Sequence, residues 1–151
     1  MTIIPPKGTA PLRPRTHTAI DPRLCGTPVA LEPGAARVEL ETVPEMAADE
    51  RGLVHGGFVF GLADYAAMLA VNHPHVVLGS AQTRYLEPVV VGERLLAAAA
   101  VREEDGRKRR VAVEVRRGGP SDHSERSGDL VMTGELLCFV PDRHVLDREE
   151  R

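Results

Sequence analysis

The sequence predicts an α+β fold in which an antiparallel sheet of about six strands wraps around one long buried helix. Three observations support this prediction. Residues 58–71 form one apolar run of helical length, and four later stretches alternate apolar and polar residues. Asp105-Gly106, between two of those stretches, is a strong β-hairpin signal. At 151 residues the chain is long enough for one domain with its own core.

The N-terminal third is expected to hold only short elements. Prolines at 5, 6, 11 and 14 predict an extended arm. Residues 16–24 predict a short helix, which Pro22 weakens. Two short strands are predicted at Pro28–Leu31 and Ala36–Val43 around the turn 32–35. A polar, acidic loop is expected over 44–54.

The predicted helix contains a single charged residue, Asp64, in the segment FVFGLADYAAMLAV. A helix apolar on all sides is buried on all sides, and burying a lone carboxylate costs several kcal/mol unless it is paired or protonated. Fourteen residues are too few to span a bilayer, which favours a protein core. Pro74 predicts that the helix ends near Asn72. Asp64 is therefore expected to have a function in the protein. The structural alternative is a carboxylate that is hydrogen-bonded by backbone amides or that reaches solvent through a gap in the packing.

The helix opens with His55-Gly56-Gly57. The two glycines let the backbone turn sharply and approach a ligand, and a helix N-terminus presents unpaired N–H groups that suit a carbonyl oxygen gaining negative charge. Asp64 follows nine residues after His55, and its carboxylate lies about 12 Å along the helix from the helix start. One helix therefore cannot bring both groups to the same carbonyl, whereas two antiparallel copies in a dimer can.

The second half of the chain predicts four long strands, at Val76–Glu87, Glu93–Glu104, Lys108–Arg117 and Asp129–Val140. Residues 118–128 predict a long mobile loop. We expect an extended arm over 1–20, the folded domain over 21–141 and a polar tail over 142–151.

Composition excludes several classes of protein. A net charge of -3 gives no general attraction to nucleic acid or anionic lipid, and 3% aromatic residues leave few platforms for bases. Cys25 and Cys138 are too few and too far apart for a disulfide framework or a metal site. No metal and no cofactor is expected.

The start of the sequence lacks a charged-then-apolar leader, which favours the cytoplasm. The basic run 107–110 is most simply a solvated turn, with a phosphate contact as the alternative.

The segment Gly52-Leu53-Val54-His55-Gly56-Gly57, followed by Leu62-Ala63-Asp64, resembles the hotdog-fold acyl-CoA thioesterases. The most similar group is the phenylacetate-pathway type, whose motif is G-x-x-H-G-G with an acid nine residues after the His. Tyr85-Leu86-Glu87-Pro88, followed by Gly92-Glu93, also matches the third strand of that family and the turn after it. The resemblance extends over about residues 24–140.

The resemblance implies roles for particular residues. Asp64 is expected to act as general base or nucleophile, and the Gly56 amide to polarise the thioester carbonyl from the partner subunit of a dimer or a dimer of dimers. His55 is expected to support the loop, with direct catalysis as the alternative. The remaining residues expected to bind substrate are Gly57, Asp49, Gln82, Thr83 and Arg84.

Asp49 departs from the family pattern, which has Asn or Gln six residues before the His. An ionised acid cannot donate to an oxyanion and would repel it. Asp49 is therefore protonated, points away, or belongs to a site that handles its substrate differently.

The expected function is hydrolysis of an acyl-CoA thioester to a free acid and CoA. The alternative is a non-catalytic acyl-CoA-binding or sensing protein on the same fold, which would have no need for Asp64. A dehydratase of this fold would require a catalytic His paired with an acid in another motif, which is not seen. Basic residues are expected near the CoA phosphates, with candidates Arg84, Arg94, Lys108, Arg109 and Arg110.

Overall fold

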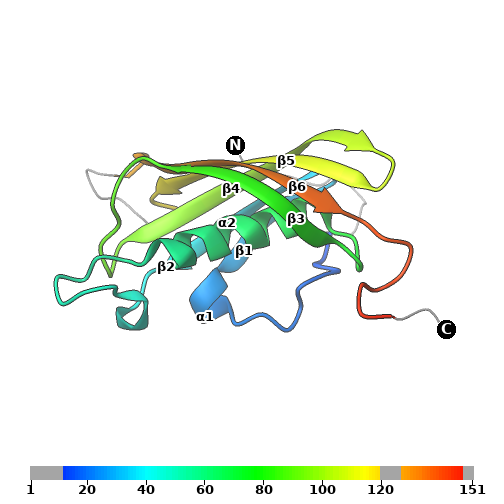
Figure 1. The fold of residues 1–151 in the computed structure, drawn as a ribbon. Helices are drawn as coiled ribbons and strands as arrows, with labels where there is room; N and C mark the ends of the chain where they lie inside the picture. Colours follow the sequence, from blue (N-terminus) through cyan, green and yellow to red (C-terminus); the bar gives the residue numbers. More distant parts are fainter. Residues whose placement is uncertain (1–11, 120–126, 148–151) are drawn as a thin grey trace.

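The computed structural model describes residues 12–119 and 127–147 (Figure 1). Its helical elements are α1 (Pro22–Cys25), the 3-10 turn η1 (Pro44–Met46) and α2 (Gly56–Val71). Its strands are β1 (Thr27–Glu32), β2 (Ala35–Glu41), β3 (Val77–Tyr85), β4 (Arg94–Asp105), β5 (Lys108–Arg117) and β6 (Leu130–Phe139).

The six strands form one antiparallel sheet in the order β1-β2-β4-β5-β6-β3. The sheet curves over α2, which packs mainly against β4, β2 and β5 (Figure 1). This arrangement confirms the predicted α+β hotdog fold. The two edges of the sheet are β1 and β3, and β3 follows directly from the helix.

The helix α2 is buried because its residues are apolar on nearly every side. Val59, Leu62, Ala63 and residues 65–70 have less than a tenth of their surface exposed. Asn72 ends the helix in the left-handed conformation, with φ 51°, and its N–H donates to the Met68 carbonyl at 2.8 Å. The end predicted near Asn72 is therefore confirmed, and the stop follows from the αL cap two residues before Pro74.

The prediction of a helix over 16–24 is wrong in extent. Only Pro22–Cys25 is helical, and Pro22 begins the helix instead of weakening it. Proline suits the first helical position because the N–H it lacks has no partner there. Asp21 caps the turn by accepting a hydrogen bond from the Arg23 N–H at 2.9 Å.

The strand predictions agree with the structure to within a few residues. Asp105 pairs with Lys108 across the hairpin turn that Asp105-Gly106 predicted. The loop predicted over 118–128 is described only at its two ends, because residues 120–126 lie outside the described part of the chain. Residues 12–20 contain no helix or strand, and the domain bounds at 20 and 141 stay predictions. In the described ranges, none of the helices has the length and apolar character needed to cross a membrane.

Candidate functional site

The turn His55-Gly56-Gly57 is held in place by the segments on both sides of it. The His55 N–H donates to the Met46 carbonyl at 2.9 Å, and the Val54 N–H donates to the Val89 carbonyl at 2.8 Å. The N-terminus of α2 is thus fixed between η1 and the connection from β3 to β4.

Gly56 is the first residue of α2, and His55 precedes it in an extended conformation. The first N–H groups of an α-helix have no acceptor within the helix, so those of Gly56 and Gly57 are available to an external acceptor. The Phe58 N–H returns to the His55 carbonyl at 3.0 Å and closes the first turn. The turn therefore offers two consecutive backbone donors at the positive end of the helix dipole.

Tyr85, at the end of β3, reaches this turn. Its hydroxyl donates to the Gly56 carbonyl at 3.2 Å. The Tyr85 ring lies beside Gly56, since a Cβ placed there would be 3.4 Å from it. The sequence motif contains Tyr85, but nothing in the sequence indicated that its hydroxyl meets the helix.

Asp64 lies two turns further along α2 and is half-buried among apolar residues. Its Oδ1 atom is buried and has no hydrogen-bond partner among the described residues. Burial raises the pKa of this carboxyl to about 6. A carboxylate with a pKa near 6 is mostly ionised at pH 7 and still basic enough to accept a proton from water.

Two thiols lie near Asp64. Burial, and then the Asp64 charge, raise the pKa of Cys25, and the same causes raise the pKa of Cys138 to about 12. Both cysteines are free, and both thiols remain protonated at neutral pH. Asp64 is therefore the group of this cluster that titrates near neutrality.

Gly56 and Asp64 lie on one uninterrupted helix. Asp64 lies eight positions after Gly56, which corresponds to about 12 Å of helix. That distance is too long for both groups to act on one carbonyl carbon, as the sequence predicted.

The side chains of His55 and Asp49 are both exposed. The His55 ring makes no capping hydrogen bond and lies edge-on to Phe58, with ring centroids 6.1 Å apart. The Asp49 Oδ1 accepts hydrogen bonds from the N–H groups of Arg51 at 3.0 Å and Leu53 at 3.2 Å. Asp49 thus shapes the loop that leads into the helix.

Gln82, Thr83 and Arg84 lie on the edge strand β3, and Gln82 and Arg84 are exposed. Three of the other basic residues that were candidates for the CoA phosphates form ion pairs. Arg94 pairs with Glu39 and Glu41, Arg109 pairs with Glu104, and Arg110 pairs with Glu103 and Glu135. Within residues 12–119 and 127–147, Arg84 and Lys108 have no ion-pair partner. Arg84 is the unpaired cation on the strand that also carries Tyr85.

Arg117, at the end of β5, is a buried charged residue that the sequence analysis did not single out. Its side chain is only 1% exposed. It donates to the Pro88 carbonyl at 2.8 Å, and it forms ion pairs with Glu93 at 3.1 Å and Asp129 at 3.4 Å. The signal was present in the strand pattern: residues 111, 113 and 115 are core valines, and 117 is the next position on that face.

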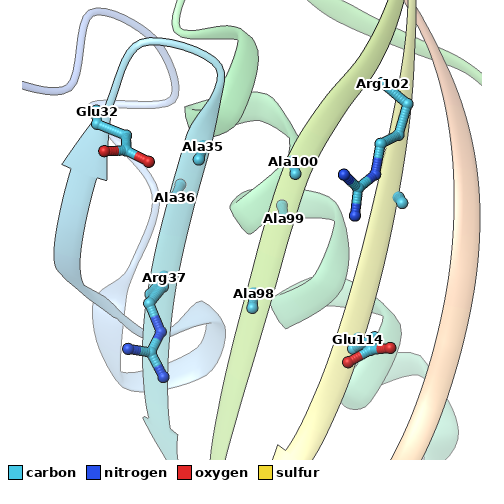
Figure 2. A pocket seen from close by; sticks show the side chains of 10 residues that line it. Glu32, Ala35, Ala36, Arg37, Ala98, Ala99, Ala100, Arg102 and Glu114 are labelled. Atoms are coloured by element: carbon cyan, nitrogen blue, oxygen red, sulfur yellow. The ribbon is translucent and has the colours of Figure 1, made fainter. Parts of the chain in front are cut away.

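A shallow hollow of about 350 Å³ lies on the face of the sheet that points away from α2 (Figure 2). Ala98 and Ala100 form its floor between Arg37, Arg102 and Glu114, with α2 behind the strands. None of the residues predicted to act on substrate lines this hollow. The part of the chain that the structure describes holds no group of three or more His, Cys, Asp or Glu side chains arranged for a metal ion.

Residues 51–122 match the model of the thioesterase superfamily. The chain belongs to this superfamily and is a PaaI-like protein of the hotdog fold.

Three solved structures are similar to this chain. An uncharacterized protein from Pyrococcus horikoshii is 48% identical, with a TM-score of 0.83, over 92% of this chain and 100% of that one. A mutant of the phenylacetic acid degradation protein PaaI from Thermus thermophilus is 30% identical, with a TM-score of 0.67, over 78% of this chain and 95% of that one. A protein from Streptococcus mutans, solved with acetyl CoA bound, shares the fold at 21% identity and a TM-score of 0.66, over 79% of this chain and 90% of that one.

The curated relatives are longer than this chain. The match to a methylthioribose-1-phosphate isomerase of Aquifex aeolicus is 51% identical over 69% of this chain but spans only 23% of that protein. The match to transcription factor FapR of Caldanaerobacter subterraneus is 27% identical, over 68% of this chain and 52% of that protein. The chain thus spans about half or less of these relatives.

Proposed function

We propose that this protein hydrolyses an acyl-CoA thioester to a free acid and CoA. The observation that carries the proposal is the buried, unpaired Oδ1 of Asp64, whose carboxyl has a pKa of about 6. It lies on the helix whose first amides are free to hold an oxyanion. Membership of the thioesterase superfamily and the acetyl CoA bound to the Streptococcus mutans neighbour support this assignment.

Each part of the site has a step in the reaction. Asp64 takes a proton from water as the water oxygen bonds to the thioester carbon, and the Gly56 N–H holds the oxyanion that forms. The tetrahedral intermediate then re-forms its carbonyl as the C–S bond breaks. The CoA thiolate leaves and takes the proton from Asp64, which returns the carboxylate to its starting form.

Two subunits complete each site in this proposal, with Asp64 from one and Gly56 from the other. The edge strand β3 supports such a dimer, because one side of it has no partner strand and most of its residues are exposed. Exposed Tyr85, Leu86, Val90 and Leu53 add apolar surface near the N-terminus of α2. Arg84, unpaired on the same strand, is the proposed contact for a CoA phosphate.

The second candidate is an acyl-CoA sensor without catalysis, favoured by the match to a transcription factor. The two candidate functions differ in whether they require the carboxylate of Asp64. Hydrolysis requires this carboxylate, whereas a protein that only binds acyl-CoA gains nothing from the cost of burying it.

CoA release from a panel of aromatic, short-chain and long-chain acyl-CoAs tests the proposal. The wild type should release CoA from at least one of them, and Asp64→Asn should lose that activity while circular dichroism shows an intact fold. Asp147→Asn, which changes an exposed carboxylate after β6 in the same way, should retain the activity. Binding of acyl-CoA without release from any member of the panel would assign the protein as a sensor.

A further inference from the structure

The hydroxyl of Tyr85 meets a specific peptide group of the helix N-terminus. It donates to the Gly56 carbonyl, whose carbon is bonded to the Gly57 nitrogen, at 3.2 Å. A hydrogen bond to the carbonyl of a peptide polarises the whole group and strengthens its N–H as a donor. The contact therefore acts on the N–H of Gly57.

Core packing does not explain this contact. Tyr85 is 51% exposed in the single chain, so the folding of one chain does not require its hydroxyl to bond the Gly56 carbonyl. The Gly56 carbonyl has two lone pairs and, as part of α2, already has a helical donor for one of them. The hydrogen bond is thus additional to what folding requires, and it joins the end of the edge strand β3 to the first turn of α2.

The preceding peptide is polarised in the same way. The His55 carbonyl, which shares its peptide with the Gly56 N–H, accepts from the Phe58 N–H at 3.0 Å. Both N–H groups that open α2 therefore belong to peptides whose carbonyls are hydrogen-bonded. The first is bonded by the backbone, and the second is bonded by the Tyr85 side chain.

We infer that Tyr85 is a positioning residue for the oxyanion site, and that its hydroxyl orients and polarises the Gly56–Gly57 peptide so that the Gly57 N–H donates beside that of Gly56. This inference rests on the proposed function. Tyr85 itself contacts the peptide and not the reacting atoms. Its contribution belongs to the transition state, where charge develops on the thioester oxygen.

Tyr85→Phe tests the inference by removing the hydroxyl while keeping the ring. The kcat should fall about three- to tenfold, the range expected for loss of one hydrogen bond, while KM changes less than about twofold. Tyr85→Leu, which also removes the ring, should be no more active. Wild-type kcat in Tyr85→Phe, in a preparation where the wild type is active, would overturn the inference.

A second measurement separates this inference from the proposed function. In ¹H–¹⁵N spectra, the Gly57 amide proton should move upfield in Tyr85→Phe, because its peptide is less polarised. Tyr65→Phe removes the chain's other tyrosine hydroxyl, from a side chain only 7% exposed, and should leave the Gly57 resonance unchanged. An unmoved Gly57 resonance in Tyr85→Phe would overturn the inference, whereas a wild type that releases no CoA would overturn the proposed function alone.

Discussion

The guanidinium of Arg117 lies 3.1 Å from the carboxylate of Glu93, which in turn accepts a hydrogen bond from the Val90 N–H at 2.7 Å. Together with its bond to the Pro88 carbonyl, this pair fixes the connection from β3 to β4. The same connection provides the Val89 carbonyl that holds Val54, directly before the helix turn. The buried guanidinium of Arg117 thus holds the β3–β4 connection, and that connection holds the segment directly before the N-terminus of α2.

We predict that Arg117→Met lowers the free energy of unfolding by about 2 kcal/mol, because the Pro88 carbonyl and the partly buried Glu93 carboxylate lose their charged hydrogen-bond donor. Urea denaturation measures this loss. Arg110→Met is the matched control, since Arg110 pairs with Glu135 at 2.6 Å but is 47% exposed. The control should lose much less stability than Arg117→Met, because an exposed ion pair is screened by solvent. Equal losses in the two variants would contradict the role given to Arg117.

Asp64→Asn is expected to stabilise the protein above pH 6. The pKa of Asp64 rises from an ordinary 3.8 to about 6 on folding, so the folded state binds more protons between these values. The wild type therefore loses stability as pH rises through this window, by about 3 kcal/mol in total.

Asn cannot ionise and escapes that loss, so the difference between Asp64→Asn and wild type should be near zero at pH 3.5 and largest above pH 7. Thermal unfolding at several pH values measures it. A constant difference between Asp64→Asn and wild type across these pH values would rule out this explanation.

The pH dependence of the wild-type rate follows from the same carboxyl. If ionised Asp64 is the base, kcat/KM should rise with pH to a plateau, with an apparent pKa of about 6. Initial rates between pH 4.5 and 8 measure the profile. A rate that falls as pH rises through 6 would instead make the protonated carboxyl the active form.

Gly56→Pro removes one proposed oxyanion donor with little change to the fold. Proline suits the first position of a helix, and His55 already has the extended φ -62°, ψ 129° that a following proline requires. The rate should fall about 10²- to 10³-fold, as for loss of an oxyanion donor.

Mixed dimers test whether Gly56 and Asp64 act across the interface. Subunits carrying Gly56→Pro, mixed with subunits carrying Asp64→Asn, should recover about a quarter of wild-type activity, because half of random dimers are hybrids with one intact site of two. No recovery after subunit exchange, or an active monomer in sedimentation, would show that the two residues do not act in trans.

Asp49→Asn is expected to leave the rate and its pH profile unchanged. The Asp49 Oδ1 accepts from two backbone N–H groups of its own loop, and the Asn oxygen can accept the same bonds. Asp49→Ala should cost about 0.5–2 kcal/mol of stability, because both acceptor contacts are lost. A faster Asp49→Asn enzyme with a shifted profile would instead place this carboxylate beside the oxyanion.

The sequence predicted the parts of the fold that follow from local patterns. The apolar run of α2, its end at Asn72 and the Asp105-Gly106 hairpin depend on neighbouring residues, and all three are present. The contact of Tyr85 with Gly56 depends on where β3 ends relative to the helix, which no local pattern specifies. Arg117 was overlooked because a basic residue before two glycines resembles a surface turn, although the alternation of β5 places it on the core face.

The strand order has a consequence for synthesis of the chain. The edge strand β3 pairs only with β6, which is the last strand of the sheet. β3 ends at Tyr85 and β6 begins at Leu130, 45 positions later in the chain. At about 5–20 residues per second, β3 leaves the ribosome roughly 2–9 seconds before its partner. During that interval Gln82, Arg84 and the other polar residues of β3 protect an unpaired edge from aggregation.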